Sequence, residues 1–402
     1  MSREPIAVIG LDGRPLDEEA EGLLREAVLV VGGERHLEML GVERERAVLL
    51  KGDLSEALDR IEAAEGSVVV LASGDPGFFG IVRLLDGRFG GENLRVLPAL
   101  SSVALAFARV RLSWDDAVTV SAHGRDPRRA TNVCRAHPKV AVLTSPDFGP
   151  AELARELDGL DRSFVVAEKL GEPDERVFQG DDVTIAGMSW KDPNMVLVLD
   201  EERVSTTRGW ISSRFGSQGR WALPEDRFEH RSGMITKSAT RAFVLSRLGP
   251  GPGDLVWDVG AGSGSVAIEC ARLGAAAVAV ERDPESCARI RRNIERHDVQ
   301  VQLTEGEAPE ALRDLPEPDG VFVGGTGGGF EEIVKLCAVS ARRAVVLALV
   351  GLERVVPAAQ ILEDCGLEVE TTFLQTSRMK GVGGLHRLAA ESNAFVVSGN
   401  RP

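Results

Sequence analysis

A strand, a glycine-rich turn and a helix follow one another in residues 255–269, and this stretch constrains the fold more than any other. Mostly apolar residues run to Asp258, and glycines then recur at every second position from Gly260 to Gly264 before a helical pattern begins. Glycine has no Cβ, so the backbone can turn sharply there and approach a ligand closely. The next apolar run ends in Glu281, 21 residues after Gly260, where an acid can hydrogen-bond the hydroxyls of a ribose. The pattern predicts the first half of a βαβ unit that binds a nucleotide.

The spacing of the glycines indicates which nucleotide is bound. A dinucleotide fingerprint places its third glycine three residues after the second, whereas Gly264 follows Gly262 by two. The G-x-G-x-G spacing after an acid resembles the turn of class I S-adenosylmethionine (SAM) methyltransferases. We therefore favour a SAM site here. A nicotinamide or flavin site and an ordinary tight turn remain as alternatives.

Composition limits the partners and the location. The 402-residue chain carries a net charge of −15, which argues against general nucleic-acid binding because such binding needs a basic face. The opening residues do not resemble a signal peptide and no run is apolar enough for a membrane span, so we expect a cytoplasmic protein without membrane contact. The five cysteines form no C-x-x-C pair and the six histidines show no ligand spacing, so we expect no metal site.

Alternating apolar segments and helical patterns predict two small α/β lobes in residues 1–200, with a break near residue 112. One predicted strand of the first lobe runs into Ala72–Gly80, where glycine, proline and aspartate gather at its carboxyl end. Ligands of α/β sheets bind at that edge. Ser101 and Ser102 precede a predicted helix and are candidates for its N-cap.

A second, unrelated domain is predicted in residues 226–402, after a linker of residues 201–225 that is rich in Arg, Ser, Gly and Thr. Its alternating βα units predict a doubly wound parallel sheet. Strand-like residues 371–376 and 394–397 are expected to form an antiparallel pair at its edge.

The order of these motifs resembles a family of fusion enzymes in cobalamin biosynthesis, the decarboxylating precorrin-6Y C(5,15)-methyltransferases. In the first half the resemblance is to the tetrapyrrole methylases, and it rests on Val31–Leu37, Ala72–Gly80, Ser101–Ser102 and Ser121–Arg125. In the second half it is to the decarboxylating methyltransferase domain, and it rests on Gly233–Lys237, Trp257–Ser265 and Phe322–Gly325.

This resemblance implies a two-lobed tetrapyrrole methylase fold in the first half and a Rossmann-like class I methyltransferase fold in the second. It implies that SAM donates two methyl groups to a small tetrapyrrole and leaves as S-adenosylhomocysteine. The first domain would methylate carbon 5, and the second would methylate carbon 15 and remove the carboxylate of the ring C acetate. The expected assembly is a homo-oligomer.

Two departures from the family pattern stand out. The first glycine turn has the altered spacing Gly10–Pro15, which bears on the geometry of the first cleft. After the fifth strand of the second domain, Gly351 stands where a threonine is common, which bears on the acceptor side of that pocket.

The expected SAM contacts fall into two sets. In the second domain, the turn Gly260, Ala261, Gly262, Ser263 and Gly264 holds the methionine part and Glu281 the ribose; Asp258 orients the turn or accepts from the amino group of SAM. By resemblance, Thr236 and Ala308 join them. In the first domain the resemblance places SAM between the lobes, lined by Ser73, Gly74, Asp75, Phe79, Ser101 and Ser102.

The substrate carries several carboxylates, so local cations are expected to bind it even in an acidic chain. Arginine suits this role because its planar fork binds a carboxylate with two hydrogen bonds. Arg125, Lys237 and Arg241 are the candidates, with a surface role as the alternative for each. Methyl transfer from SAM needs mainly alignment of donor and acceptor, which fits the absence of a recognisable nucleophile–base pair near either turn.

Three other functions compete with this interpretation. In the first, one domain would be a SAM-dependent RNA or protein methyltransferase joined to an inactive N-terminal scaffold. In the second, the chain would be a nicotinamide-dependent oxidoreductase. In the third, one domain would have no activity and would only support the other. The acidic charge argues against RNA, and the glycine spacing argues against nicotinamide.

Overall fold

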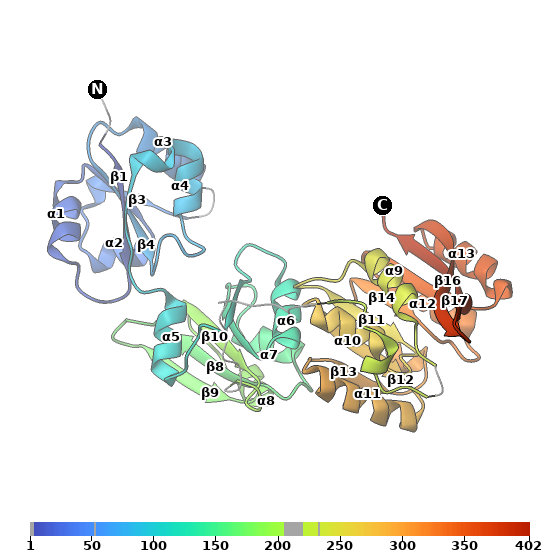
Figure 1. The fold of residues 1–402 in the computed structure, drawn as a ribbon. Coiled ribbons are helices and arrows are strands. Elements are labelled where there is room, and N and C mark those ends of the chain that lie inside the picture. Colours follow the sequence, from blue (N-terminus) through green and yellow to red (C-terminus); the bar gives the residue numbers. More distant parts are fainter. Residues whose placement is uncertain (1–3, 52–53, 205–219, 232–233) are drawn as a thin grey trace. The chain divides into compact units, whose positions relative to one another are not determined.

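The computed structural model describes residues 4–51, 54–204, 220–231 and 234–402 (Figure 1). They divide into two compact units, one of residues 1–125, 141–158 and 162–199, and the other of residues 126–140, 159–161 and 200–402. Most of the predicted linker and Gly233 of the predicted Gly233–Lys237 motif lie outside the described residues. Within the described part, no helix has the length and apolarity needed to cross a membrane.

The first sheet of the first unit is parallel, with the strand order β3-β2-β4-β1-β5. Alternate side chains of its strands enter two hydrophobic clusters, so both faces are covered; α1 and α2 pack on one face, and α3 and α4 on the other. The elements are β1 (Ile6–Leu11), α1 (Glu18–Glu26), β2 (Leu29–Gly32), α2 (Glu34–Met39), β3 (Ala47–Leu49), α3 (Ser55–Ala63), β4 (Val68–Ser73), α4 (Val82–Phe89) and β5 (Leu94–Leu97).

The second sheet has the order β6-β7-β10-β8-β9, in which the β10–β8 and β8–β9 pairs are antiparallel. The chain enters it through α5, whose N-cap Ser101 accepts a hydrogen bond from the Ala104 amide at 3.2 Å. The elements are α5 (Ser102–Val110), β6 (Val118–Ser121), α6 (Pro127–Ala136), β7 (Lys139–Leu143), α7 (Pro150–Glu156), β8 (Ser163–Glu168), β9 (Arg176–Gly180), α8 (Asp182–Ala186) and β10 (Asn194–Leu199).

The second unit contains a seven-stranded sheet of order β13-β12-β11-β14-β15-β17-β16. The helices α9, α10 and α11 supply one face of its core, and α12 and α13 supply the other. The elements are α9 (Ser238–Leu248), β11 (Leu255–Val259), α10 (Ser265–Arg272), β12 (Ala276–Glu281), α11 (Pro284–His297), β13 (Gln302–Glu305), β14 (Gly320–Val323), α12 (Phe330–Ser340), β15 (Ala344–Leu349), α13 (Val355–Asp364), β16 (Glu368–Val382) and β17 (Leu385–Asn400).

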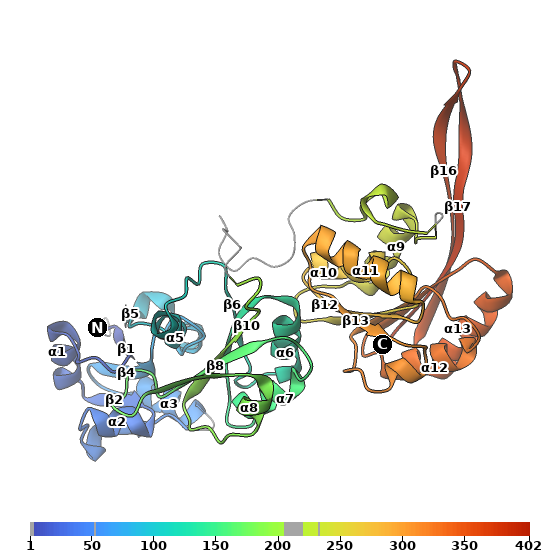
Figure 2. The ribbon, with the colours of Figure 1, turned by 90° about the horizontal axis from the view of Figure 1, so that it is seen from below.

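The antiparallel edge pair β16–β17 is much longer than the predicted segments. Figure 2 shows the hairpin extending well past the other strands of its sheet. Its turn is Gly383–Gly384, both with positive φ (55° and 83°), as a two-residue hairpin turn requires.

The predicted α/β class is confirmed, with two lobes in the first half and a doubly wound sheet in the second. Two strands of the structure were absent from the prediction, β3 and β9. The first, Ala-Val-Leu, is apolar but has only three residues, and the second, Arg-Val-Phe-Gln-Gly, is half-buried or exposed at a sheet edge and has no apolar run.

Candidate functional sites

The turn after β11 lies directly against the loop after β14. Gly260 has a φ of +68°, and a Cβ on it would stand 2.2 Å from the carbonyl oxygen of Gly325. Its amide and that of Ala261 donate to the Val280 carbonyl of β12, at 3.0 and 3.1 Å. Only glycine at position 260 therefore allows three neighbouring strand ends to meet, and they meet at the carboxyl edge where α/β sheets hold ligands.

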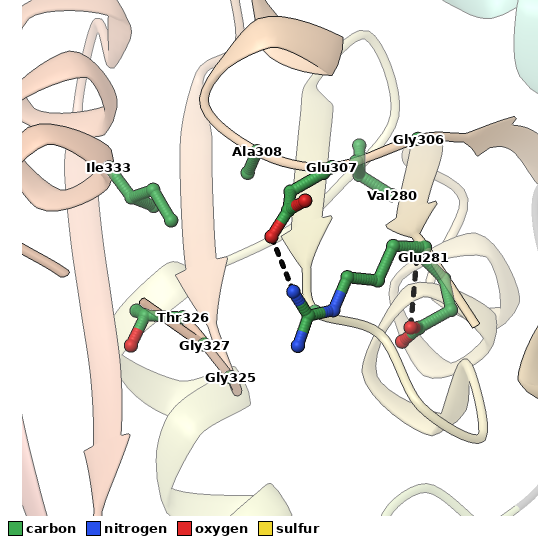
Figure 3. A pocket seen from close by; sticks show the side chains of 11 residues that line it. Val280, Glu281, Gly306, Glu307, Ala308, Gly325, Thr326, Gly327 and Ile333 are labelled. Atoms are coloured by element: carbon green, nitrogen blue, oxygen red, sulfur yellow. Dashed lines mark hydrogen bonds and ion pairs between the residues drawn. The ribbon is translucent and has the colours of Figure 1, made fainter. Parts of the chain in front are cut away.

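Glu281 ends β12 and organises the same turn. Its Oε2 accepts from the Gly262 amide at 2.8 Å, and its Oε1 accepts from the Arg282 and Asp283 amides at 2.9 and 3.0 Å. Figure 3 shows its carboxylate at the edge of the pocket.

A cavity of about 200 Å³ opens at this edge. It brings together three of the predicted SAM contacts, Gly260, Glu281 and Ala308. The sequence reasoning did not assign its other lining residues, which come from three strand ends and, for Ile333, from helix α12: Val280, Arg282, Gly306, Glu307, Gly325, Thr326, Gly327 and Ile333. Arg282 and Glu307 form an ion pair within it (Figure 3).

The other residues predicted to contact SAM, Thr236, Asp258 and the turn residues 261–264, are not among those that line this cavity. Gly264 has a φ of +72° and is the N-cap of α10, and the Ser263 carbonyl accepts from the Asn293 side chain at 2.9 Å. Thr236 is half-buried and its carbonyl accepts from Arg241. These hydrogen bonds hold in place the backbone segments that we predicted to bind SAM.

Asp258 is buried, with a relative exposure of 1%. Its Oδ2 accepts from the Ala267 amide at 2.9 Å in the first turn of α10, whereas its Oδ1 has no partner among the described protein atoms. Burial raises the pKa of Asp258 to about 7. Asp258 therefore orients the helix that follows the turn.

Arg241 requires a correction, because the expectation that it meets a substrate carboxylate is wrong. Its relative exposure is 0%, its guanidinium donates to the Thr236 and Leu223 carbonyls, and it lies 3.7 Å from the equally buried Glu269. Arg241 lies four residues after Lys237, and this spacing alone did not indicate that its side chain points into the domain. Lys237 is half-buried as the N-cap residue of α9.

The first unit contains two neighbouring cavities, of about 150 and 500 Å³. All six predicted SAM contacts and Arg125 line one or both of them. Ser73 and Ser102 line both, Gly74 lines the smaller, and Asp75, Phe79, Ser101 and Arg125 line the larger.

Two side chains of the larger cavity make a basic and aromatic wall. The Arg125 guanidinium lies 5.9 Å from the centre of the Phe79 ring, and Phe79 packs edge-on against Phe78. Asp75 accepts from the Gly77 amide at 2.8 Å, so its carboxylate also shapes the turn. The wall suits an acceptor that is both planar and negatively charged.

The altered first turn, Gly10–Pro15, is stabilised by Asp12. This buried carboxylate pairs with Arg14 and accepts from the Leu100 amide at 3.0 Å, and these hydrogen bonds lower its pKa. The turn is thereby tied to the loop that carries Ser101, and Asp12 also lines the smaller cavity.

The sequence reasoning also missed His36, which lies in helix α2 after β2 and lines the larger cavity. Its Nε2 lies 3.2 Å from Ser73 Oγ and 3.1 Å from Arg35 Nη2. Burial, with Arg35 nearby, lowers the pKa of His36 to about 4. His36 lies in Val31–Leu37, one of the segments on which the family resemblance rests. A single histidine in a sequence, however, does not indicate which neighbouring strand its side chain will face.

Two family models match the chain. Residues 7–182 match the tetrapyrrole (corrin/porphyrin) methylases, and residues 226–398 match a precorrin methyltransferase domain. A precorrin-6Y C(5,15)-methyltransferase [decarboxylating] of Sinorhizobium sp is 39% identical over 351 residues, which are 83% of this chain and 80% of that protein.

Two shorter relatives each match less than half of the chain. A probable cobalt-precorrin-6B C(15)-methyltransferase (decarboxylating) of Pyrobaculum calidifontis is 32% identical over 44% of this chain and 94% of its own length. A cobalt-precorrin-7 C(5)-methyltransferase of Salmonella typhimurium is 34% identical over 43% of this chain and 86% of its own length.

Proposed function

The chain belongs to the family of decarboxylating precorrin-6Y C(5,15)-methyltransferases, and from this premise we propose that it divides the two methyl transfers between its two units. It is a SAM-dependent methyltransferase of cobalamin biosynthesis. We assign methylation of carbon 5 to the tetrapyrrole methylase half. Methylation of carbon 15 and loss of the ring C acetate carboxylate belong to the precorrin methyltransferase half.

The observation that carries this assignment is the presence of two separate cavities at strand ends of unlike sheets. Relatives about half as long also bear one activity each in their names, C(5) for one and C(15) with decarboxylation for the other. Both observations support one reaction site in each unit.

In the second unit the residues present fit SAM. Glu281 offers a carboxylate to the ribose hydroxyls, and the turn from Gly260 to Gly264 is assigned to the methionine part. When bound, SAM supplies an electrophilic methyl group on sulfur.

In the first unit, Ser73, Gly74, Asp75, Phe79, Ser101 and Ser102 hold SAM, and Arg125 binds a carboxylate of the acceptor. The chain's part in each reaction is to align the acceptor carbon with the methyl group and to exclude water. Decarboxylation places its electrons in the conjugated macrocycle, so the second unit needs to orient the acetate and supplies no covalent group.

The test uses the full chain, precorrin-6Y and SAM with a labelled methyl group. The wild type is expected to transfer two methyl groups and release one carbon dioxide per substrate. Asp75→Ala should remove only the label at carbon 5, and Glu281→Ala should remove the label at carbon 15 together with carbon dioxide release. Transfer of neither methyl group by the wild type would overturn the function, and the reverse pattern of losses would overturn the assignment.

A further inference from the structure

An arginine at the carboxyl edge of the second unit's sheet has no acidic partner. Arg354 ends the short helical turn Leu352–Arg354, which follows β15, and its side chain is exposed. Within the described residues it forms no ion pair, not even with the adjacent Glu353. By contrast, Arg282 on the wall of the nearby cavity pairs with Glu307. Arg354 therefore keeps a positive charge that no described acid neutralises.

Neutral groups nevertheless hold the Arg354 side chain in place. Its Nη1 donates to Thr326 Oγ1 at 2.8 Å, and its Nη2 donates to the Gly327 carbonyl at 3.4 Å. The guanidinium also lies 5.1 Å from the centre of the Phe330 ring. These contacts occupy two of the N–H groups of the guanidinium and leave the others, including Nε–H, for a ligand.

The order of the strands places Arg354 beyond the methionine end of SAM. Strands β12, β11, β14 and β15 are neighbours in that order and all run parallel. We assign the ribose to Glu281 after β12 and the methionine part to the turn after β11, so the loops after β14 and β15 come next along the same edge. Thr326, which holds Arg354, also lies on the wall of the SAM cavity (Figure 3). An acceptor that approaches the methyl group therefore meets these two loops.

Exposed apolar side chains flank Arg354 in the sequence. Val350 is 84% exposed, Leu352 is 60% exposed and Val356 is 71% exposed. Apolar side chains next to a cation suit a ligand that has an apolar face and acidic substituents. A reduced tetrapyrrole has both, because carboxylate side chains surround its macrocycle.

A cation can help or hinder decarboxylation, depending on the carboxylate that it binds. The ring C acetate loses its negative charge as the bond to the carboxyl carbon breaks and the electron pair moves into the macrocycle. A guanidinium on that carboxylate stabilises the starting state more than the transition state, and so slows the release of carbon dioxide. The other carboxylates keep their charge throughout. A guanidinium on one of them orients the macrocycle without opposing the reaction.

We propose that Arg354 binds an acceptor carboxylate that the reaction retains, while Val350 and Leu352 contact the apolar face of the macrocycle. This inference rests on the proposed function of the second unit. Arg354 positions the acceptor carbon against the methyl group of SAM. Because the retained carboxylate has the same charge before and during the reaction, the contact stabilises both states equally. Its loss raises the KM for the acceptor and leaves kcat unchanged.

The experiment measures carbon dioxide release and methyl transfer to carbon 15 by the full chain, at saturating SAM and varied precorrin-6Y. Arg354→Met removes the charge and keeps an apolar side chain. We expect its KM for precorrin-6Y to rise about tenfold, the lower end for a lost hydrogen bond to a charged group, because solvent and salt screen an exposed pair. Its kcat should stay within twofold, with one carbon dioxide released per methyl group at carbon 15. Arg354→Lys keeps the charge without the planar fork and should have an intermediate KM.

Arg342→Met is the matched control. Arg342 precedes β15, at the opposite end of the same strand, and pairs with exposed Glu317. Its KM should stay within twofold of the wild type. Added salt should raise the KM of the wild type and of Arg342→Met more than that of Arg354→Met, because salt screens only a charge that is present. A purely structural role of Arg354 does not produce this difference.

A KM for Arg354→Met within twofold of the wild type would show that Arg354 binds no acceptor carboxylate. A rise in kcat for carbon dioxide release would assign Arg354 to the departing acetate, and a kcat that falls more than the KM rises would make it a structural residue. SAM affinity more than tenfold weaker, measured by calorimetry in an Asp75→Ala background, would assign it to the cofactor. Each of these results overturns the proposal. The proposed function fails separately, because it predicts that the wild type methylates carbon 15 and releases carbon dioxide.

Discussion

The carboxylate of Glu281 accepts a hydrogen bond from the Gly262 amide at 2.8 Å, so the acid at the end of β12 also fixes the glycine turn after β11. The two features that suggested a SAM site from sequence, 19 residues apart, are parts of one hydrogen-bonded unit. A ligand that binds Glu281 through its ribose therefore meets a turn that is already in place, which reduces the ordering cost of binding.

Glu281→Ala should weaken SAM binding at the second unit by about 10- to 100-fold, because hydrogen bonds to a charged group contribute roughly 1.5–3 kcal/mol. Calorimetry in an Asp75→Ala background counts only this site. Glu305→Ala is the matched control, since Glu305 ends the neighbouring strand β13 in register with Glu281 and pairs with exposed Arg291. Equal affinities for the two variants would contradict the role of Glu281.

Gly260→Ala should destabilise the second unit far more than Gly262→Ala. Both positions have positive φ, which costs an alanine about 1–2 kcal/mol. Only at Gly260 would the new Cβ strike a backbone atom, the Gly325 oxygen at 2.2 Å, whereas nothing lies within 4 Å at Gly262. Urea unfolding of both variants measures the difference, and similar midpoints would refute the packing argument.

Arg241→Met should lower the free energy of unfolding by about 3–5 kcal/mol, because it leaves Glu269 buried with one partner fewer. Arg247→Met is the control on the same helix. Its ion pair with Glu370 is partly exposed, so its loss should cost less than about 1 kcal/mol. A small effect at Arg241 would reopen the question of its role.

The first unit should lose stability in acid through His36. Its folded-state pKa of about 4 lies below the ordinary 6.5, so the unfolded chain binds more protons between these two pH values. Stability is therefore complete above pH 6.5 and falls as the pH drops toward 4, by about 2 kcal/mol between pH 7 and pH 5. Arg35 is the charged group that contacts the ring, and it is itself paired with Glu172.

Denaturant unfolding of the wild type and His36→Gln at both pH values isolates this effect. The free energy of unfolding should decrease less from pH 7 to pH 5 in the variant than in the wild type, because glutamine does not titrate. An identical decrease in the two proteins would assign the acid sensitivity to other groups.

Local patterns predicted most of the fold. The strand limits Leu94–Leu97 and Gly320–Val323 and the helix Ser238–Leu248 agree with the structure, because each is an unbroken apolar or amphipathic run. The hairpin β16–β17 was recognised only near its base. Its outer part is exposed and mixes polar residues with Met379, Val382, Leu385 and Leu388, so it has no regular alternation, although Gly383–Gly384 was a turn signal that the prediction did not use.

The sites were less predictable than the fold, because a cavity joins residues that are distant in sequence. The glycine turn and Glu281 follow from a single βαβ pattern. By contrast, the approach of Gly325 to Gly260 depends on β14 lying beside β11, and the meeting of His36 with Ser73 depends on β2 lying beside β4. The burial of Arg241 depends on Phe228 and Glu269, to which the helical spacing gives no clue.

The close crossing at Gly260 has a counterpart in the unrelated first unit, where a Cβ on Gly10 would stand 2.3 Å from the Gly74 carbonyl oxygen. In both cases the obstacle is a main-chain atom, which every amino acid possesses. No replacement at Gly74 or Gly325 can therefore compensate for a side chain at Gly10 or Gly260. Selection for suppressors of a substitution at either position is expected to restore glycine at that position.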